Sequence, residues 1–352
     1  YYTAKQNADR VLIASEQRRK AIHNLIRNVR VAYWRAVAGE KLGQRVKETI
    51  KDAERALFNS RKLSSGGLHS AGQSLRYQRN LLENLRLLGD VQRELASARV
   101  ELTNLMGVLP ATKFSLQEPE LSERPLSLDM DQLESRALMQ NSELREQFYN
   151  ARIAAQNTRK ALLKLLPGIS FDYGRYDDND RYLVNQQWSA AGVRVSFNLF
   201  NLLSASTVMN AAEQAVAVED AKRMALQMSV LTRVHLASFQ YNDSLQRLDR
   251  AKQIFDVDAQ LEQIAKSKSE SSMAGEQSKI SSSVTSILSN LGRYQAMAKV
   301  QESIGKMQAS LGMEPELVSI DTLSLEDLGV GVKNWLNQGF GAATIEGPIS
   351  GG

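Results

Sequence analysis

The sequence predicts a mainly α-helical protein with one small β part. Hydrophobic residues make up 43% of the 352 residues but aromatic residues only 6%, a balance that favours long helices over a conventional mixed core. All six prolines lie at positions 110, 119, 125, 167, 315 and 348, so helices can run long between them without a kink. The segment 167–200 instead alternates apolar and polar residues, as a β-hairpin does.

The first two predicted helices form an antiparallel hairpin with a coiled-coil seam. Residues 2–62 are helix formers almost throughout, and such a helix would be on the order of 90 Å long. In the following helix, apolar residues recur in an a/d heptad pattern, at Leu81, Leu88, Val91, Leu95, Ala98, Leu102 and Leu105. Paired glycines at Gly66 and Gly67 release the chain from the helix between them.

The second half of the chain repeats this plan. A predicted helix over 203–267 carries a heptad series of Ile254, Val257, Leu261 and Ile264, and a polar turn leads to another helix over 276–312. The landmarks keep their register: Trp34 precedes Gly67 by 33 residues, and Tyr241 precedes Gly275 by 34. The hairpins end alike, at Met106-Gly107 and Leu311-Gly312. This agreement predicts an internal duplication.

We divide the chain into six segments on this basis. These are a first helical hairpin (1–107), a linker with three prolines (108–130), a long helix (131–166), the strand pair (167–200), a second helical hairpin (201–312) and a final segment with the tail (313–352). Only the second hairpin is preceded by a helix and a strand pair. A complete duplication would place an equivalent helix and strand pair ahead of Tyr1.

The strand pair differs on its two faces as a membrane strand pair does. The odd positions Ala191, Val193, Val195, Phe197 and Leu199 are apolar, whereas the even positions Gly192, Arg194, Ser196 and Asn198 are small or polar, with Trp188 and Phe200 bracketing the run. A two-stranded ribbon is marginal in water, and unpaired edges are not tolerated in lipid. Closure into a ring by neighbouring copies of the chain would solve both problems.

Charge and composition exclude several other functions. Residues 1–62 hold 15 basic and 6 acidic residues, a net charge of +9, but these charges surround every helical face without an aromatic stacking platform, so no nucleic-acid binding is expected.

Cysteine is absent, the three histidines stand apart, and no glycine-rich phosphate loop follows a strand. We therefore expect neither an enzyme nor a metal or cofactor site. No run of 18 apolar residues occurs, so no membrane-spanning helix is expected.

Four carboxylates of the second half leave two interpretations open. Asp249, Asp256, Asp258 and Glu262 lie on the predicted heptad helix. They either line a pore or stand just outside the coiled-coil seam, as charged residues on such helices usually do.

Several short motifs together resemble the TolC-type outer-membrane efflux and secretion channels. The resemblance covers about residues 1–315. It rests on Ala32-Tyr33-Trp34, on the tips Gly67-Leu-His-Ser70 and Gly275-Glu-Gln-Ser278, and on the two helix exits. Its most specific part runs from Leu133 to Asn201, with Arg136-Ala137-Leu138, Asn141-Ser-Glu-Leu144, Leu166-Pro167-Gly-Ile-Ser170 and Leu199-Phe200-Asn201.

The resemblance implies a homotrimer in the outer membrane of a Gram-negative-type bacterium. Three copies would share a twelve-stranded β-barrel, four strands each, continued into the periplasm by a tunnel of helices and a belt from the segments after each hairpin. Such a channel performs no chemistry and needs no cofactor: it is a passive exit for drugs, toxins or secreted proteins, serving a tripartite efflux or type I secretion system.

The resemblance also assigns roles to particular residues. The tips that dock a periplasmic adaptor, itself linked to an inner-membrane pump, would be Gly67, Leu68, Ser70, Gly275, Glu276 and Ser278. Lipid-facing residues would be Trp188, Val193, Val195, Phe197 and Leu199, and lumen-facing ones Arg194, Ser196 and Asn198.

The sequence departs from this family in two respects. Only one strand pair is present, so three copies would supply six strands rather than twelve. Where some members carry acidic gate residues, this chain reads Lys279-Ile-Ser-Ser-Ser-Val284, which leaves Ser281 and Ser282 as candidates to narrow the aperture. The alternative interpretation is a soluble coiled-coil scaffold or adaptor that binds partners through its helical hairpins.

Overall fold

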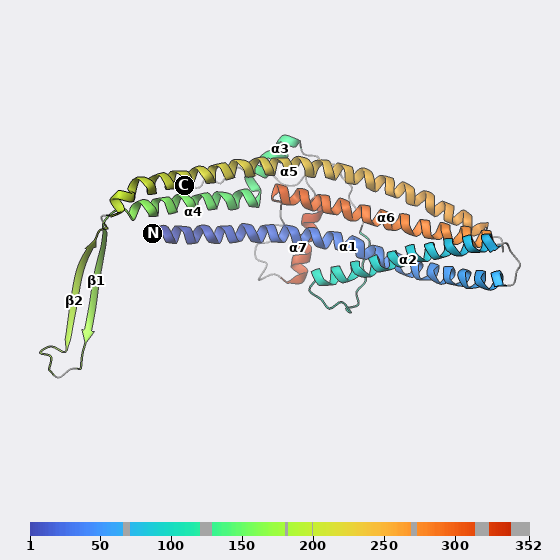
Figure 1. The fold of residues 1–352 in the computed structure, drawn as a ribbon, viewed down its shortest axis with the longest axis horizontal. Coiled ribbons are helices and arrows are strands. Elements are labelled where there is room, and N and C mark those ends of the chain that lie inside the picture. Colours follow the sequence, from blue (N-terminus) through green and yellow to red (C-terminus); the bar gives the residue numbers. More distant parts are fainter. Residues whose placement is uncertain are drawn as a thin grey trace. The chain divides into compact units, whose positions relative to one another are not determined.

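The structure, a computed structural model, describes residues 1–65, 71–119, 129–179, 182–198, 200–268, 273–313 and 324–338 (Figure 1). The helices are α1 (Tyr2–Ser65), α2 (Ala71–Leu105), α3 (Met130–Gln140), α4 (Ser142–Leu163), α5 (Phe200–Ser267), α6 (Met273–Leu311) and α7 (Leu325–Gln338), and the strands are β1 (Gly168–Asp177) and β2 (Gln187–Ser196). The predicted combination of long helices and one short β-hairpin is confirmed.

The chain divides into two compact units. The hairpin unit consists of 1–19 and 139–230, and the bundle unit of 20–138 and 231–352. Helices α1 and α5 contribute residues to both. None of the helices in the described ranges combines the length and the apolar character needed to cross a membrane.

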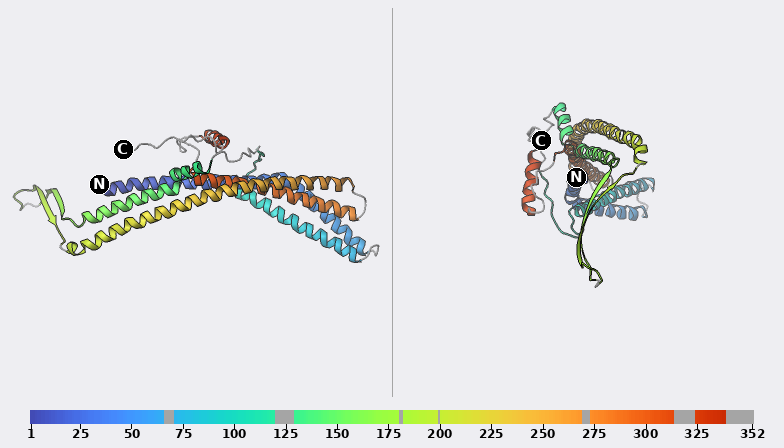
Figure 2. Two further views of the ribbon diagram at one scale, coloured as in Figure 1. Left: turned by 90° about the horizontal axis from the view of Figure 1, so that it is seen from above. Right: turned by 90° about the vertical axis from the view of Figure 1, so that its left-hand side faces the viewer.

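The bundle unit has its core between α1, α2, α5 and α6 (Figure 2). The predicted seam of α2 is buried: Leu81 and Leu88 are fully inaccessible, and Leu95 is 7% exposed. Its partners include Val37 and Leu42 of α1 and Tyr241 of α5. The absence of proline lets each helix present its apolar stripe to the others over many turns.

The heptad series on α5 lies on an unexpected face. Ile254, Val257, Leu261 and Ile264 have the predicted spacing, but each remains about half exposed, between 48% and 57%. The buried residues of α5 follow a different series, which includes Tyr241, Leu248 and Glu262. The apolar series is therefore not the buried seam of this helix within one chain.

Helices α2 and α6 end in the same backbone conformation. Gly107 and Gly312 have φ values of 69° and 63°, which glycine adopts without strain. The residue after each glycine donates to a carbonyl five positions back, Val108 to Thr103 at 3.1 Å and Met313 to Gln308 at 2.9 Å. Both exits are thus closed by the Schellman hydrogen bond.

The predicted helix over 131–166 is two helices, α3 and α4, and that prediction is corrected. Asn141 is extended, with φ −61° and ψ 125°, and its side-chain oxygen accepts hydrogen bonds from the backbone N–H groups of Glu143 and Leu144 at 3.0 and 3.3 Å. An asparagine in this position satisfies donors that a new helix would leave unpaired. The sequence starts a second helix here because the cap competes with continuation of the first.

A polar interface joins α1 and α4 in the hairpin unit. Asp9, fully buried, pairs with Arg152, and Glu16, 4% exposed, pairs with Arg145 at 3.0 Å. Both acids and both arginines are seven residues apart in the sequence, and the two helices run antiparallel. One heptad position on each helix is therefore occupied by charge instead of an apolar residue.

The final described helix, α7, was not predicted. It begins after Ser324, whose hydroxyl donates to the Asp327 carboxylate at 2.6 Å and accepts from the Asp327 N–H at 3.2 Å. This reciprocal contact caps the helix start.

Candidate membrane hairpin and helix tips

One face of the strand pair is apolar. The strands run antiparallel, with Ile169 opposite Val195 and Phe171 opposite Val193. Because side chains alternate across a strand, these four residues share one face. All four are more than 60% exposed, so nothing in the described part of the chain covers them.

The other face is polar. Ser170 lies opposite Arg194, and Asp172 lies opposite Gly192. A Cβ on Gly192 would be 2.5 Å from a carboxylate oxygen of Asp172, so the absence of a side chain leaves room for this carboxylate. The two strands pair only with each other among the described residues, and each therefore keeps one edge without strand partners.

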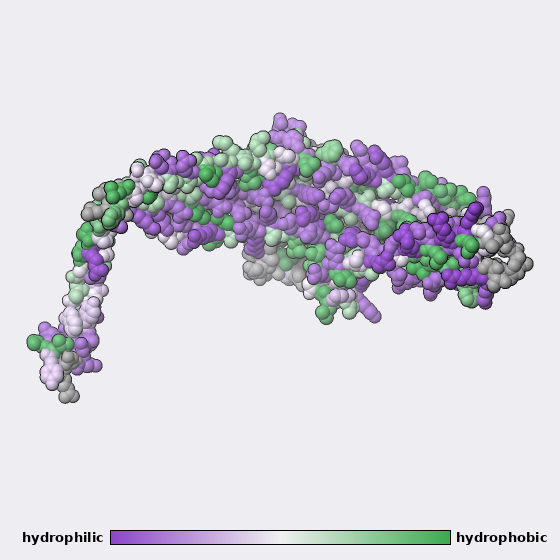
Figure 3. Space-filling view, in the orientation of Figure 1, coloured by the Kyte–Doolittle hydropathy of each residue, from purple (hydrophilic) through white to green (hydrophobic). Residues whose placement is uncertain are grey.

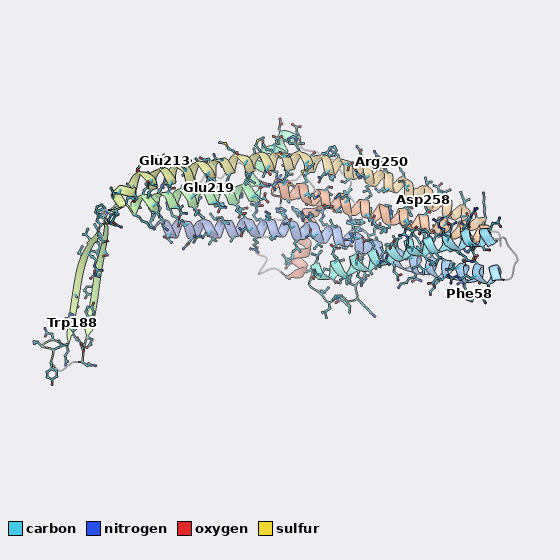
Figure 4. The ribbon with its side chains drawn as sticks, in the orientation of Figure 1. Phe58, Trp188, Glu213, Glu219, Arg250 and Asp258 are labelled. Carbon is cyan, nitrogen blue, oxygen red and sulfur yellow. The ribbon has the colours of Figure 1, made fainter. Side chains whose placement is uncertain are left out.

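Trp188 belongs to the polar face. It lies opposite Tyr176, and the two rings stack with their centroids 5.4 Å apart near the end of the hairpin, where Figure 4 labels Trp188. Trp188 and Arg194 are six positions apart, so the pleat puts both on one face. The prediction that grouped Trp188 with Val193 and Val195 is therefore wrong.

The hairpin joins the helices through a junction of apolar and polar residues. Phe197 is 41% exposed and Phe200 76% exposed, and a hollow of about 680 Å³ lies between the end of α4, the strands and the start of α5. Asn198, predicted to face a lumen, accepts a hydrogen bond from the Phe200 N–H at 3.1 Å and so caps α5. Leu199 lies outside the described residues.

The predicted docking tips are only partly described. Gly67, Leu68 and Ser70 lie outside the described residues. Gly275 and Glu276 lie in the first turn of α6 rather than in the turn before it, and Ser278 is exposed.

Glu276 also links α6 to α2. The Tyr77 hydroxyl donates to its carboxylate at 3.2 Å. Burial and then the negative charge of Glu276 raise the pKa of Tyr77 well above its usual value, so the phenol stays protonated and keeps donating.

The candidate aperture serines lie along the same contact between α2 and α6. Asn84 donates to the Ser281 hydroxyl at 3.2 Å, and Ser281 and Ser282 are both half-buried. Ser281 therefore uses its hydroxyl within the chain.

A buried charge network next to these serines was missed by the sequence reasoning. Glu262, 5% exposed, pairs with Arg45 of α1, accepts from Ser283 of α6 at 2.9 Å and pairs with Lys266 at 2.7 Å. Arg45 also donates to Ser286 at 3.1 Å. Glu262 thus neither faces an open space nor stands outside the seam.

The charge of Glu262 is strongly stabilised. Burial by itself would raise its pKa, but hydrogen bonds from Lys266, Arg45 and Ser283 outweigh this and lower the pKa of Glu262 to about 2. A sequence signal existed: Glu262 follows Tyr241 and Leu248 in steps of seven, and both of these are buried.

No metal centre emerges from the described residues, because His, Asp and Glu side chains form no group of three or more that could bind an ion there. The groups with perturbed pKa values described above contact other side chains within the helical bundle. These groups therefore join helices of the bundle unit to one another.

Comparison with solved structures identifies the fold. Long antiparallel helical hairpins that carry a short strand pair are the fold of outer-membrane channel proteins, and the resemblance drawn from the sequence is confirmed at the level of the fold. No family model matches the sequence, and no curated protein matches it.

Solved structures supply the comparison. The chain is similar to the outer-membrane channel OprN, with 15% identity, a TM-score of 0.66 and coverage of 88% of this chain and 71% of that one. It is similar to the Campylobacter jejuni CmeC outer membrane channel, with 12% identity, a TM-score of 0.66 and coverage of 95% and 71%. For the Vibrio cholerae outer membrane protein VceC the values are 13%, 0.62, 89% and 76%.

Proposed function

We propose that this chain is the subunit of a trimeric outer-membrane channel that provides a passive exit for drugs, toxins or secreted proteins. It would reside in the outer membrane of a Gram-negative-type bacterium and extend into the periplasm. It would catalyse no reaction and bind no nucleic acid.

The observation that carries this proposal is the strand pair. Its apolar face, with Ile169, Phe171, Val193 and Val195, is exposed in the chain, its strands lack outer partners among the described residues, and it is attached to long helices. Such a ribbon is stable when neighbouring strands close it into a barrel with the apolar face towards lipid. The fold shared with outer-membrane channels supports this assembly.

In the proposed assembly Val193, Val195, Phe197 and Leu199 face lipid, and Arg194, Ser196 and Asn198 face the lumen together with Trp188. Twelve strands would require four from each copy, of which β1 and β2 are two. The six segments defined from the sequence keep their proposed roles, with the tunnel formed by 1–107, 131–166 and 201–312 and the belt by 108–130 and 313–352. The matching exits at Gly107 and Gly312 support an internal duplication.

The helix tips would bind a periplasmic adaptor that connects the channel to an inner-membrane pump. Ser278 is exposed at the start of α6, so an adaptor could contact it there. We propose the same docking role for Gly67, Leu68 and Ser70. Ser281 and Ser282 would narrow the aperture near the tips. Because their hydroxyls are uncharged, we expect no strong ion selectivity at this aperture.

Single-cysteine labelling tests the membrane assignment. The chain has no cysteine, so cysteines introduced one at a time over 189–199 are its only thiols. A water-soluble maleimide applied to intact membranes should label positions 194 and 196 at least tenfold faster than 193 and 195. Equal labelling of odd and even positions would contradict the proposal.

Extraction distinguishes the channel from a soluble coiled-coil scaffold. An integral barrel should stay with the membrane in alkaline carbonate and leave it only with detergent. Release by salt or alkali alone would favour the scaffold.

A further inference from the structure

Helix α5 exposes an apolar stripe on one side, and at the same level along the helix axis its buried side carries a charge. The outer stripe consists of Ile254, Val257, Leu261 and Ile264, each about half exposed. At the same height, the buried side of α5 carries Glu262, which pairs with Arg45 of α1. A helix in water normally has the opposite arrangement, with apolar residues inside and charges outside.

The stripe has the geometry of a coiled-coil seam. Its spacing of three and four residues corresponds to the a and d positions of a heptad, which accept side chains from one facing helix. One heptad before Val257 stands Arg250 (labelled in Figure 4), so the apolar series does not continue in this direction. Figure 3 shows hydrophobic surface over this part of α5. The exposed apolar area is on the order of 300 Å², a size at which patches on proteins are often functional.

Charges beside the stripe indicate what covers it. Asp258 lies on α5 between Val257 and Leu261 of the stripe, and within the described residues it has no ion-pair partner. Lys47 and Lys51, which are exposed and one turn apart on α1 beside Arg45, also lack ion-pair partners in the described ranges. Lysine stems can cover apolar side chains while their ammonium groups reach nearby carboxylates.

We infer that the α5 stripe of one copy packs against residues 41–51 of α1 in a second copy of this chain. The contact between Arg45 and Glu262 fixes 41–51 and 258–264 at one height in the bundle unit. Copies related by rotation about an axis along the helices keep that height, so the lysines of the next copy would meet the stripe and Asp258 directly. Two different surfaces meet, as a closed ring of identical subunits requires.

This inference rests on the proposed trimer and names the surfaces that hold it together outside the strands. To test it, we would attach a benzophenone maleimide to Leu261→Cys and co-express this chain with a cysteine-free copy that bears a different tag. The matched control is Gln263→Cys, an exposed position two residues away, off the stripe. The complex is purified in detergent without any adaptor and irradiated.

We expect adducts between the two tagged copies, with mass spectrometry placing the attachment within residues 41–51 of the unlabelled copy. The yield from the control position should be at least tenfold lower. Sedimentation gives the mass of the same sample. A trimer without such adducts, or with adducts elsewhere in the second copy, would overturn the inference and leave the proposed channel standing. A monomer would overturn both.

Discussion

The hydroxyl of Ser283 donates a hydrogen bond of 2.9 Å to the carboxylate of Glu262, so that α6 and α5 are joined by a buried polar contact. Arg45 brings α1 to the same carboxylate. Three helices of the bundle unit therefore meet at one negative charge. Removing that charge should weaken the contacts with Ser283, Arg45 and Lys266 at once, because a glutamine offers these donors one neutral amide oxygen in place of a carboxylate.

Glu262→Gln is expected to destabilise the chain in a pH-dependent manner. The pKa of Glu262 is lowered from 4.5 to about 2, so its charge favours the folded state. This contribution is fully present above pH 4.5 and is lost as the pH falls through the folded pKa near 2. We expect a loss of about 2 kcal/mol at neutral pH, measured by thermal unfolding followed by circular dichroism.

The dependence of stability on pH below neutrality checks this prediction. Asp256→Asn on the same helix is the control, because Asp256 is exposed and lacks an ion-pair partner within the described residues. Its effect should be small at every pH. If the difference between Glu262→Gln and the parent chain were the same at neutral pH as near the folded pKa, the charge would not be the source of the stability.

Gly305 and Gly292, both in α6, should respond to alanine in opposite directions. A Cβ on Gly305 would be 2.8 Å from the Cβ of Arg27 and 3.3 Å from its Cα, whereas a Cβ on Gly292 would have no atom within 4 Å. Gly305→Ala must push α1 and α6 apart and should cost about 1–3 kcal/mol. Gly292→Ala should stabilise by about 0.5–1 kcal/mol, because alanine favours the helix.

Thermal midpoints of the two variants measure this difference directly. The same substitution in the same helix makes each variant the control for the other. Equal effects would mean that α1 and α6 do not approach closely at Gly305.

The two faces of β2 should tolerate a positive charge very differently. Val195→Arg would place a charge on the apolar face and should cost about 2–4 kcal/mol in the membrane. Ser196→Arg, on the face of Arg194, should be nearly neutral. The amount of detergent-extracted trimer in outer-membrane fractions is the measurement, and equal loss in both variants would argue against a lipid-facing apolar side.

The charged interface between α1 and α4 should be rescued by exchanging its partners. Asp9 is fully buried and pairs with Arg152. Asp9→Arg would place a positive charge at a buried position beside the half-exposed Arg152, with an expected loss of about 3–5 kcal/mol, because the buried charge would have no opposite partner. Adding Arg152→Asp restores opposite charges and should recover at least half of the lost thermal stability. A double variant no better than the single one would show that the two residues are not coupled.

The sequence predicted the elements better than the faces of those elements. Proline-free stretches and the leucine series of α2 were sufficient for the helices, and alternation was sufficient for the hairpin. Heptad spacing alone did not say which side of α5 faces the core, because it does not distinguish a seam within the chain from one between copies. Glu262 was misread for a related reason: local charge patterns do not reveal a partner such as Arg45, more than 200 residues away.

For the candidate site, the sequence predicted the two faces of the strand pair but not the place of every residue. The alternation of Val193, Arg194 and Val195 fixed the two faces, and the structure reproduces them through the strand register. Trp188 was misplaced because aromatic bracketing was given more weight than its even position. The cap at Asn141 could have been recognised from the sequence Asn-Ser-Glu-Leu, since asparagine is a favoured N-cap and acidic residues are enriched in the first turn of a helix.

Substitution at the α6 tip should separate docking from folding. Ser278 is exposed one turn into α6, so Ser278→Trp should leave the helical content unchanged while reducing adaptor binding at least tenfold, because a bulky ring blocks the surface that the adaptor would cover. Gln92→Trp, at an exposed position in the middle of α2, is the control and should bind normally. Surface-immobilised adaptor and purified channel give the dissociation constants. If both variants bound as tightly as the parent chain, the adaptor would have to dock away from Ser278, and the role proposed for this tip would be wrong.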